Sequence, residues 1–491
     1  MRRILGTETE YGIIARSPHL PDPVANSLRL IAQCPDLPSP EAIWAYENEN
    51  PFWDARGYRV EGEPERPGPN YNRQLNKILA NAGRLYVDGA HPEYSTPECS
   101  NPREALVYER AGDHIVADCL ARLNASLGSE EFIVYRNNSD GKGNSFGYHE
   151  NYLLPRRIPF DRLAAVLLPF FVTRQIYCGA GKVGAENGTD PVSYQLSQRA
   201  DFFECLLDLN TMVGRPIINT RDEPHAHRGE YRRLHVIVGD SNMAEVSTFL
   251  KIGTTAVIMD MLEQDGTFPE IDLSDPVHAI KQVSRDLTLK EPLKLHNGNH
   301  TSAIEIQRAY LHAAHRFYTT RECTPVTKDI LVRWESVLDK LDRVPRSLHR
   351  ELDWVAKHKL ITSYMDRKGC SWHDPRVAMM DLQYHDVRPA KSLSCTLERS
   401  GQLERITHDE EISHARKTAP QLTRAYFRGA CLNRFPRQIY GVSWTSVLLE
   451  TGNRTIKRIP LLDPYRGTHQ LTSELFQDIE TVDQLLSRLA P

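Results

Sequence analysis

The sequence predicts an α+β protein with a largely antiparallel sheet and helices packed on one side. Two segments that alternate polar and apolar residues, 6–12 and 84–88, predict strands near the N-terminus. Asn101 followed by Pro102 predicts the start of a helix that ends near Gly128, and strands are predicted at 132–138 and 147–153. Helical periodicity then dominates from residue 276 to residue 368. This order of elements is typical of an antiparallel sheet covered by helices.

The first two strands carry the most informative side chains. Since side chains alternate between the faces of a strand, Glu8 and Glu10 share one face of the first strand. Arg84, Tyr86 and Asp88 likewise share one face of the second strand. These groups would meet if the two strands lie side by side, although a sheet with one solvated face shows the same alternation.

The segment that follows, residues 91–98, favours a site over a solvated face. It adds His91 and two more carboxylates, Glu93 and Glu98. Closely packed carboxylates repel one another unless cations neutralise them, and oxygen ligands suit Mg²⁺, which also bridges nucleotide phosphates. The sequence therefore predicts a site for Mg²⁺ and a nucleotide on the sheet.

Residues 21–81 form a long insertion between the two site strands. The insertion is rich in Pro, Asn and acidic residues, with Trp44, Tyr46, Phe52 and Trp53 spaced through it. Long irregular segments are uncommon inside compact domains, so we expect a loop that covers or gates the site or binds a partner. A tether without function is the alternative.

The length of 491 residues favours two domains. A polar interval at 400–422 divides a large catalytic domain, residues 1–415, from a small C-terminal α/β domain, residues 416–491. Strands are predicted at 440–447 and 455–459, on either side of a turn at 452–453. The apolar run 163–172 is too short to cross a bilayer and is predicted to be a core helix.

Charge and cysteine content limit the function classes. The net charge of −4 gives no electrostatic footprint for nucleic acid or an acidic membrane, so neither is an expected partner. Nine scattered cysteines without a CxxC pair, and the absence of a signal-peptide pattern at the N-terminus, favour a cytoplasmic protein with reduced thiols.

Three further segments of the sequence have the form of binding motifs. The GxGxxG match at 179–184 is not followed by a helical pattern, which argues against a dinucleotide site, and the chain has no GxxxxGK[ST] loop. His225 and His227 form an HxH pair that is expected on a surface loop. Arg233 and His235 share a face of a predicted strand, where they could bind phosphate and metal or serve only as core residues.

Several motifs in one order resemble the Pup ligase and Pup deamidase/depupylase family, relatives of glutamine synthetase and glutamate-cysteine ligase. The resemblance runs almost from end to end, through GTETEYGI, RLYVDGAHPEYSTPE, YRNNSDGKGNSFGYHENYL, QLSQRADF, NTRDEPHA, YRRLHVIVGDSNMAE, RAYFRGACLNRF and RIPLLDPYRGT. It implies a large glutamine synthetase-like domain with a curved, mostly antiparallel sheet that cradles ATP and Mg²⁺.

The resemblance also implies roles for individual residues. Asp88 would be the catalytic carboxylate, and Glu150 and His149 would be neighbours of the site. The residues implied in nucleotide binding are Arg84, Thr96, Trp444 and Arg233. The residues implied in metal or water coordination are Glu8, Glu10, Tyr86, Glu93 and His235.

Members of this family either join Pup, a small ubiquitin-like protein, to substrate lysines or act as deamidases and depupylases. Gly6-Thr7-Glu8, the motif at 140–143 and the long insertion look more like the deamidase, whereas Thr96 looks more like the ligase. The first expectation is therefore a cytoplasmic hydrolase of the C-terminal glutamine amide of Pup and of the Pup–lysine bond, functionally linked to the bacterial proteasome. Its partners would be Pup and pupylated proteins.

Other functions stay open at this point. An ATP-consuming Pup–protein ligase is the first alternative, a ligase of small molecules is the second, and a regulator without chemistry is the third. In the hydrolase, Asp88 would attack the amide directly or activate water, with ATP as an organising cofactor. A basic groove for Pup is expected among the arginines Arg199, Arg221, Arg228, Arg232 and Arg233.

Overall fold

The computed structural model describes residues 3–17, 20, 22–64 and 66–490. The helices are α1 (Pro23–Ile31), α2 (Pro69–Leu75), α3 (Pro102–Leu127), α4 (Phe160–Cys178), α5 (Glu245–Glu263), α6 (Pro276–Arg285), α7 (Ala303–Tyr318), α8 (Pro325–Arg343), α9 (Asp353–Lys368), α10 (Pro375–Tyr384), α11 (Leu393–Arg399), α12 (Asp409–Ala415), α13 (Ala425–Arg434), α14 (His469–Thr472) and α15 (Val482–Leu489). The strands are β1 (Leu5–Glu10), β2 (Gly12–Ala15), β3 (Ile43–Trp44), β4 (Asn76–Ile78), β5 (Arg84–Asp88), β6 (His91–Ser95), β7 (Phe132–Tyr135), β8 (Tyr148–Pro155), β9 (Lys182–Val183), β10 (Tyr194–Gln195), β11 (Cys205–Asp208), β12 (Pro216–Asn219), β13 (Tyr231–Val236), β14 (Leu293–Lys294), β15 (His300–Thr301), β16 (Ile439–Ser443), β17 (Ser446–Glu450) and β18 (Ile456–Pro460).

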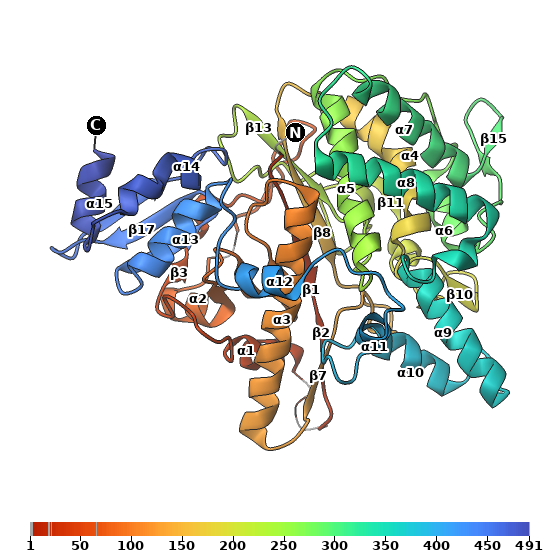
Figure 1. Ribbon diagram of the computed structural model, residues 1–491, viewed down its shortest axis with the longest axis horizontal. Coiled ribbons are helices and arrows are strands. Elements are labelled where there is room, and N and C mark those ends of the chain that lie inside the picture. The colour runs from red at the N-terminus through yellow and green to blue at the C-terminus, as the bar shows by residue number, and fades with distance from the viewer. Residues whose placement is uncertain (1–2, 18–19, 21, 65, 491) are drawn as a thin grey trace.

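The central element is a six-stranded sheet with the order β13-β8-β1-β6-β5-β4, in which every neighbouring pair is antiparallel. Figure 1 shows the helices α4 to α8 gathered on one side of the molecule and the long helix α3 crossing its middle. The largest apolar core lies among these helices and the sheet and contains Phe170, Phe249 and Trp334. The predicted α+β class with a mostly antiparallel sheet is confirmed.

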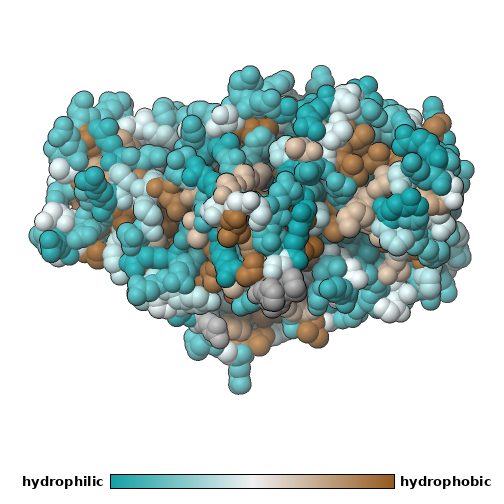
Figure 2. Space-filling model, turned by 90° about the horizontal axis from the view of Figure 1, so that it is seen from below, coloured by the Kyte–Doolittle hydropathy of each residue, from teal (hydrophilic) through white to brown (hydrophobic). Residues whose placement is uncertain are grey.

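Local signals in the sequence account for several elements. Helix α3 begins where the Asn101 side chain accepts a hydrogen bond from Glu104 N at 3.0 Å, and it ends at Gly128, whose φ of 65° suits glycine. Helix α4 is a buried core helix with Pro169 inside it, as the apolar run predicts. Within the described residues, no helix is both long and apolar enough to span a membrane. The face in Figure 2 carries scattered apolar patches on a largely hydrophilic surface.

The insertion is not the irregular loop that its composition suggests. It contains α1, β3, α2 and β4, and β4 is the edge strand of the central sheet. Strand β3 pairs in parallel with β16, so it completes a second sheet with the order β18-β17-β16-β3. Pairing over such a sequence distance leaves no local pattern, which explains why the sequence analysis missed it.

The C-terminal unit has its own apolar core, built around Val442, Val447 and Leu449 with Trp44 from the insertion. The strand predicted at 440–447 is in fact two strands, because β16 turns sharply at Trp444 and Thr445 into β17. The boundary between residues 415 and 416 stays a prediction.

Candidate functional site

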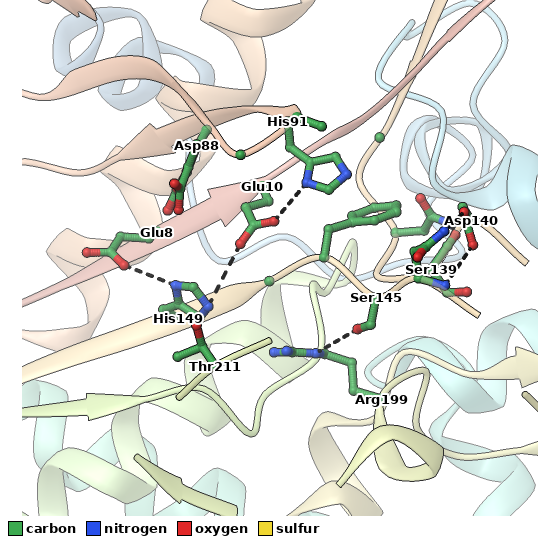
Figure 3. Close-up of a pocket in the computed structure, with 18 of the residues that line it drawn as sticks. Glu8, Glu10, Asp88, His91, Ser139, Asp140, Ser145, His149, Arg199 and Thr211 are labelled. Carbon is green, nitrogen blue, oxygen red and sulfur yellow. Dashed lines mark hydrogen bonds and ion pairs between the residues drawn. The ribbon is translucent and has the colours of Figure 1, made fainter. Parts of the chain in front are cut away.

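A cleft of about 1270 Å³ lies on one face of the central sheet and takes side chains from β1, β5, β6, β8 and β13. The sequence predicts that the side chains of β1 and β5 meet if the two strands lie side by side. The strands are not adjacent, because β6 lies between them. The register places Glu10 opposite Glu93 and Glu93 opposite Tyr86, so one row of side chains crosses all three strands. The predicted acidic groups therefore converge, with Glu93 as the link. Figure 3 shows Glu8, Glu10 and Asp88 pointing into the same space.

The first group of possible metal ligands consists of Glu8, His149 and His235, whose ligand atoms lie within 4.8 Å of one another. His149 Nδ1 lies 3.1 Å from Glu8 Oε2. Burial opposes ionisation of Glu8, but the His149 hydrogen bond and the charges of His149, Arg233 and Arg221 lower its pKa to about 2. Glu8 is thus a carboxylate.

His235 is arranged to keep a lone pair. Burial, followed by the charge of Arg233, lowers the pKa of His235 well below its ordinary value, so the ring is neutral. Its Nδ1 lies 3.0 Å from Asn151 Oδ1, an oxygen that also accepts from Arg233 Nη1 at 2.7 Å. Nδ1 therefore carries the proton, and Nε2 is the atom free to bind a metal.

The second group consists of Glu10, Asp88 and Glu93. His91 Nδ1 lies 3.1 Å from Glu10 Oε2. Burial opposes ionisation of Glu10, but this hydrogen bond and the charges of His149 and His91 together lower its pKa. Burial and the charge of Glu10 raise the pKa of Asp88. Burial and the charges of Asp88, Glu8 and Glu10 raise the pKa of Glu93 well above its ordinary range.

These carboxylates fit a bound cation. Glu93 is 1% exposed, and its Oε2 is buried without a hydrogen-bond partner. Glu8, Glu10, Asp88 and Glu93 lie close together in the cleft and repel one another, and hard divalent cations prefer such oxygen ligands. Gly147 leaves room for the side chains of His149 and Glu10, because a Cβ there would lie 2.4 Å from His149 Nε2 and 2.5 Å from Glu10 Oε1.

Arg84 forms a cationic platform at one end of the cleft. Its guanidinium lies 4.3 Å from the Trp44 ring and 3.9 Å from the Tyr86 ring, and Nη2 donates to Tyr46 Oη at 2.9 Å. Among the described residues Arg84 has no ion pair, so its charge is available to an anion. Tyr86 lies outside both groups of possible ligands, and burial raises the pKa of its phenol well above the ordinary value. Its predicted coordination of metal or water stays a prediction.

Thr96 and Trp444 line a smaller pocket of about 80 Å³ that adjoins the cleft. Thr96 Oγ1 accepts a hydrogen bond from Thr7 N at 2.9 Å, so its hydroxyl holds the start of β1. Trp444, in the turn between β16 and β17, lines both the pocket and the cleft and lies 5.0 Å from the Trp44 ring.

Two expectations for neighbouring residues are wrong. Successive side chains of a strand point to opposite faces, and the neighbouring His149 faces the cleft. Glu150 therefore faces away from the cleft, where it pairs with Arg174 at 2.5 Å. His225 lines the cleft, whereas the HxH pattern suggested a surface loop; only His227 is exposed.

The five arginines expected to form a Pup groove do not make one surface. Arg232 is 8% exposed and donates to Ile158 O, and Arg228 stacks on Trp53 at 3.6 Å. Arg233 Nη1 binds Asn151, and its Nε donates to Glu223 O. Arg199, Arg221 and Arg233 line the cleft, whereas Arg228 and Arg232 do not. Arginine content alone does not reveal which side chains the fold turns inward.

Arg215 lies in the cleft wall near Arg199, although no motif in the sequence singles it out. Burial and the charge of Arg215 lower the pKa of Arg199 to about 9. Among the described residues neither arginine has a carboxylate partner; Arg199 Nη1 donates to Ile237 O and Arg215 Nε donates to Thr211 O at 2.9 Å. Two buried arginines without a paired carboxylate make this part of the cleft a candidate site for an anion.

Comparisons with known proteins agree with this geometry. The chain shares its fold with the Pup ligase PafA: a complex of PafA with Pup superposes with a TM-score of 0.81 at 32% identity, over 100% of this chain and 95% of PafA. PafA in complex with ADP superposes with a TM-score of 0.75 at 33% identity, over 85% and 97% of the two chains.

The family model described as "Pup-ligase protein" matches residues 3–448, and the chain belongs to this family. It is 43% identical to the depupylase of Acidothermus cellulolyticus over 100% of this chain and 99% of that protein. It is 40% identical to the Pup deamidase/depupylase of Mycolicibacterium smegmatis, over the full length of both. A Pup–protein ligase of Actinosynnema mirum is 40% identical over 84% of this chain and 92% of the ligase.

Proposed function

We propose that this protein hydrolyses the side-chain amide of the C-terminal glutamine of Pup and the isopeptide bond between Pup and a substrate lysine. The observation that carries the proposal is the sequence similarity to proteins named depupylases, which reaches 43% identity. Proteins named depupylases align with the whole chain, whereas the ligase of A. mirum aligns with 84% of it at a comparable identity. Pup and pupylated proteins would be the partners, with a functional link to the bacterial proteasome.

The cleft supports Mg-ATP as an organising cofactor. Glu8, His235, Glu10 and Glu93 would hold Mg²⁺, and Arg84, with Arg233 near the phosphates, would contact the nucleotide beside Thr96 and Trp444. When bound, the metal and the nucleotide would supply positive charge and a fixed polar surface beside the scissile amide.

Asp88 is the proposed catalytic residue. Its side chain is open to the cleft. Burial and the charge of Glu10 raise its pKa, and the charges of His149, Arg221 and Arg84 oppose this rise. The carboxylate would attack the amide carbon, and a water would protonate the departing nitrogen, which leaves as ammonia or the lysine amine. The hydroxide that remains would then open the anhydride and regenerate the Asp88 carboxylate. Alternatively, the carboxylate would take a proton from a water that attacks the same carbon. Arg221 and Arg84 would oppose the charge that develops on the carbonyl oxygen in either route.

The test is to incubate the purified protein with Mg-ATP and Pup ending in glutamine, and to follow the replacement of the amide group by hydroxyl with mass spectrometry. Conversion by the wild type and none by Asp88→Asn is the expected result. Attachment of glutamate-ended Pup to lysine, with ATP consumed, would instead show a ligase, the second candidate that the PafA fold favours.

The cytoplasm is the proposed location. None of the nine cysteines forms a disulfide in the described structure, and unpaired thiols suit a reducing compartment.

A further inference from the structure

The insertion is clipped to the wall of the cleft at one point. Residues 53–55 run antiparallel to residues 220–222, with Asp54 directly opposite Arg221. Ala55 N donates to Thr220 O at 2.7 Å, and Asp222 N donates to Trp53 O at 2.8 Å. The two hydrogen bonds therefore hold the main chain on both sides of Arg221. We call residues 53–56 the clip.

Asp54 anchors the clip. Its side chain is 1% exposed, and Oδ2 accepts from Thr220 Oγ1 at 2.5 Å and from Arg56 Nη2 at 2.8 Å. Its Oδ1 accepts from Arg56 N at 2.8 Å and from Arg56 Nε at 2.9 Å. Four hydrogen bonds to one buried carboxylate fix both the turn of the clip and its contact with Thr220.

Arg221, in contrast, has nothing of its own to hold its side chain. In the part of the chain that the structure describes, its guanidinium makes no hydrogen bond and no ion pair, and Nε is buried without a partner. Yet the side chain lines the same cleft as the carboxylates of Glu8 and Asp88. The direction of this side chain consequently depends on the backbone that carries it.

We propose that Asp54 is a positioning residue, which through the clip and Thr220 aims Arg221 at the carboxylates of the cleft. The insertion is then part of the catalytic scaffold. Asp222 is also held by Arg156, whose Nη1 lies 2.8 Å from Asp222 Oδ2, so the unique contribution of the clip is at Thr220. The inference deepens the proposed function, because Asp88 is the residue to which hydrolysis is assigned.

The experiment is a double-mutant cycle between Asp54→Ala and Arg221→Ala, with hydrolysis of glutamine-ended Pup as the readout. A small misplacement of an orienting group costs about 10- to 100-fold in rate, so we expect Asp54→Ala to lower kcat by that factor with little change in KM. In the Arg221→Ala background the same substitution should cause no further loss. Equal losses in both backgrounds would overturn the inference.

Two additions keep the result decisive. Thr220→Val removes the hydroxyl from the clip without touching Asp54 and should reproduce the kcat loss; Glu63→Ala, in an exposed part of the same insertion, should not. Hydrogen exchange over residues 216–224 tests the clip without relying on activity. Exchange as slow in Asp54→Ala as in the wild type would overturn the inference, while a wild type that hydrolyses nothing would reject only the proposed function.

Discussion

Glu93 lies in the middle of β6 and Glu98 lies three residues beyond its end, yet the two carboxylates have opposite electrostatic surroundings. Glu98 Oε1 lies 2.7 Å from Arg424 Nε, and its other oxygen pairs with Arg428. Although burial opposes ionisation, the two arginines lower the pKa of Glu98 to about 2. Glu93 instead faces three other carboxylates, and its pKa is raised.

The difference separates a structural carboxylate from a functional one. Glu98 ties the large sheet to the C-terminal unit, and the protein itself supplies the balancing charge. The repulsion around Glu93 has no such balance within the described residues, which is the arrangement expected where a cation or substrate completes the site. Cleft carboxylates should therefore limit stability and support activity, while Glu98 should do the reverse.

The largest expected effect is the loss of activity in Asp88→Asn. Without a carboxylate there is neither a nucleophile nor a base, so turnover should fall by about 10⁴-fold or more. Because the substitution removes one of several like charges, the midpoint of urea unfolding should stay at or above that of the wild type. Mass spectrometry of Pup and urea denaturation measure the two effects. A strongly destabilised Asp88→Asn variant would contradict the distinction between the cleft carboxylates and the structural carboxylate Glu98.

Next comes Glu98→Gln, which leaves two buried arginines without their counter-ion. We expect the free energy of unfolding at pH 7 to fall by about 3–5 kcal/mol. Because the folded pKa of Glu98 lies below its ordinary value of 4.5, the wild type should lose this stabilisation as the pH falls from about 4.5 towards 2. Urea denaturation of both proteins at pH 7 and at low pH is the measurement, and a difference independent of pH would contradict it.

A smaller effect concerns magnesium. Saturating Mg²⁺ at a hundred times its dissociation constant stabilises a protein by about 2.7 kcal/mol. Loss of a ligand in Glu93→Gln should remove much of this gain, whereas the Glu98→Gln variant should keep it. Thermal unfolding with Mg²⁺ and with a chelator provides the data. Equal gains in the two variants would place the metal away from Glu93.

The smallest effect is on the metal-free protein, where Glu93→Gln should stabilise by about 1–2 kcal/mol at pH 7. A raised folded pKa means that the stabilising contribution of Glu93 is complete below its ordinary pKa of 4.5 and is lost as the pH rises through the raised value. The gain over the wild type should therefore vanish below about pH 4.5. As the pH rises, the wild type should lose the stabilising contribution of Glu93 and gain that of Glu98. Unfolding curves of the wild type and both variants, recorded in a chelator at several pH values, measure the two trends.

Local patterns in the sequence predicted the faces of the site strands, and the structure confirms that Glu8, Glu10, Arg84 and Asp88 line one cleft. The place of β6 between β1 and β5 could not be seen, because strand order depends on tertiary pairing. The family resemblance supplied the roles, which alternation alone does not contain.

The arginines show a second limit of prediction from the sequence. Arg199 and Arg232 look alike in sequence, yet one lies in the cleft without a counter-ion and the other binds a main-chain carbonyl outside it. Likewise, nothing near Trp44 in the sequence indicates that it joins the C-terminal core. Burial of single side chains depends on partners hundreds of residues away.

The parallel pairing of β3 with β16 places a constraint on synthesis of the chain. Trp44 is 1% exposed only after residues near Val442 have been made, and at about 5–20 residues per second the ribosome needs roughly 20–80 s for that interval. During this time a large aromatic surface of the nascent insertion has no partner. The insertion therefore leaves the ribosome well before β16 is made, and until then chaperones and proteases can reach it.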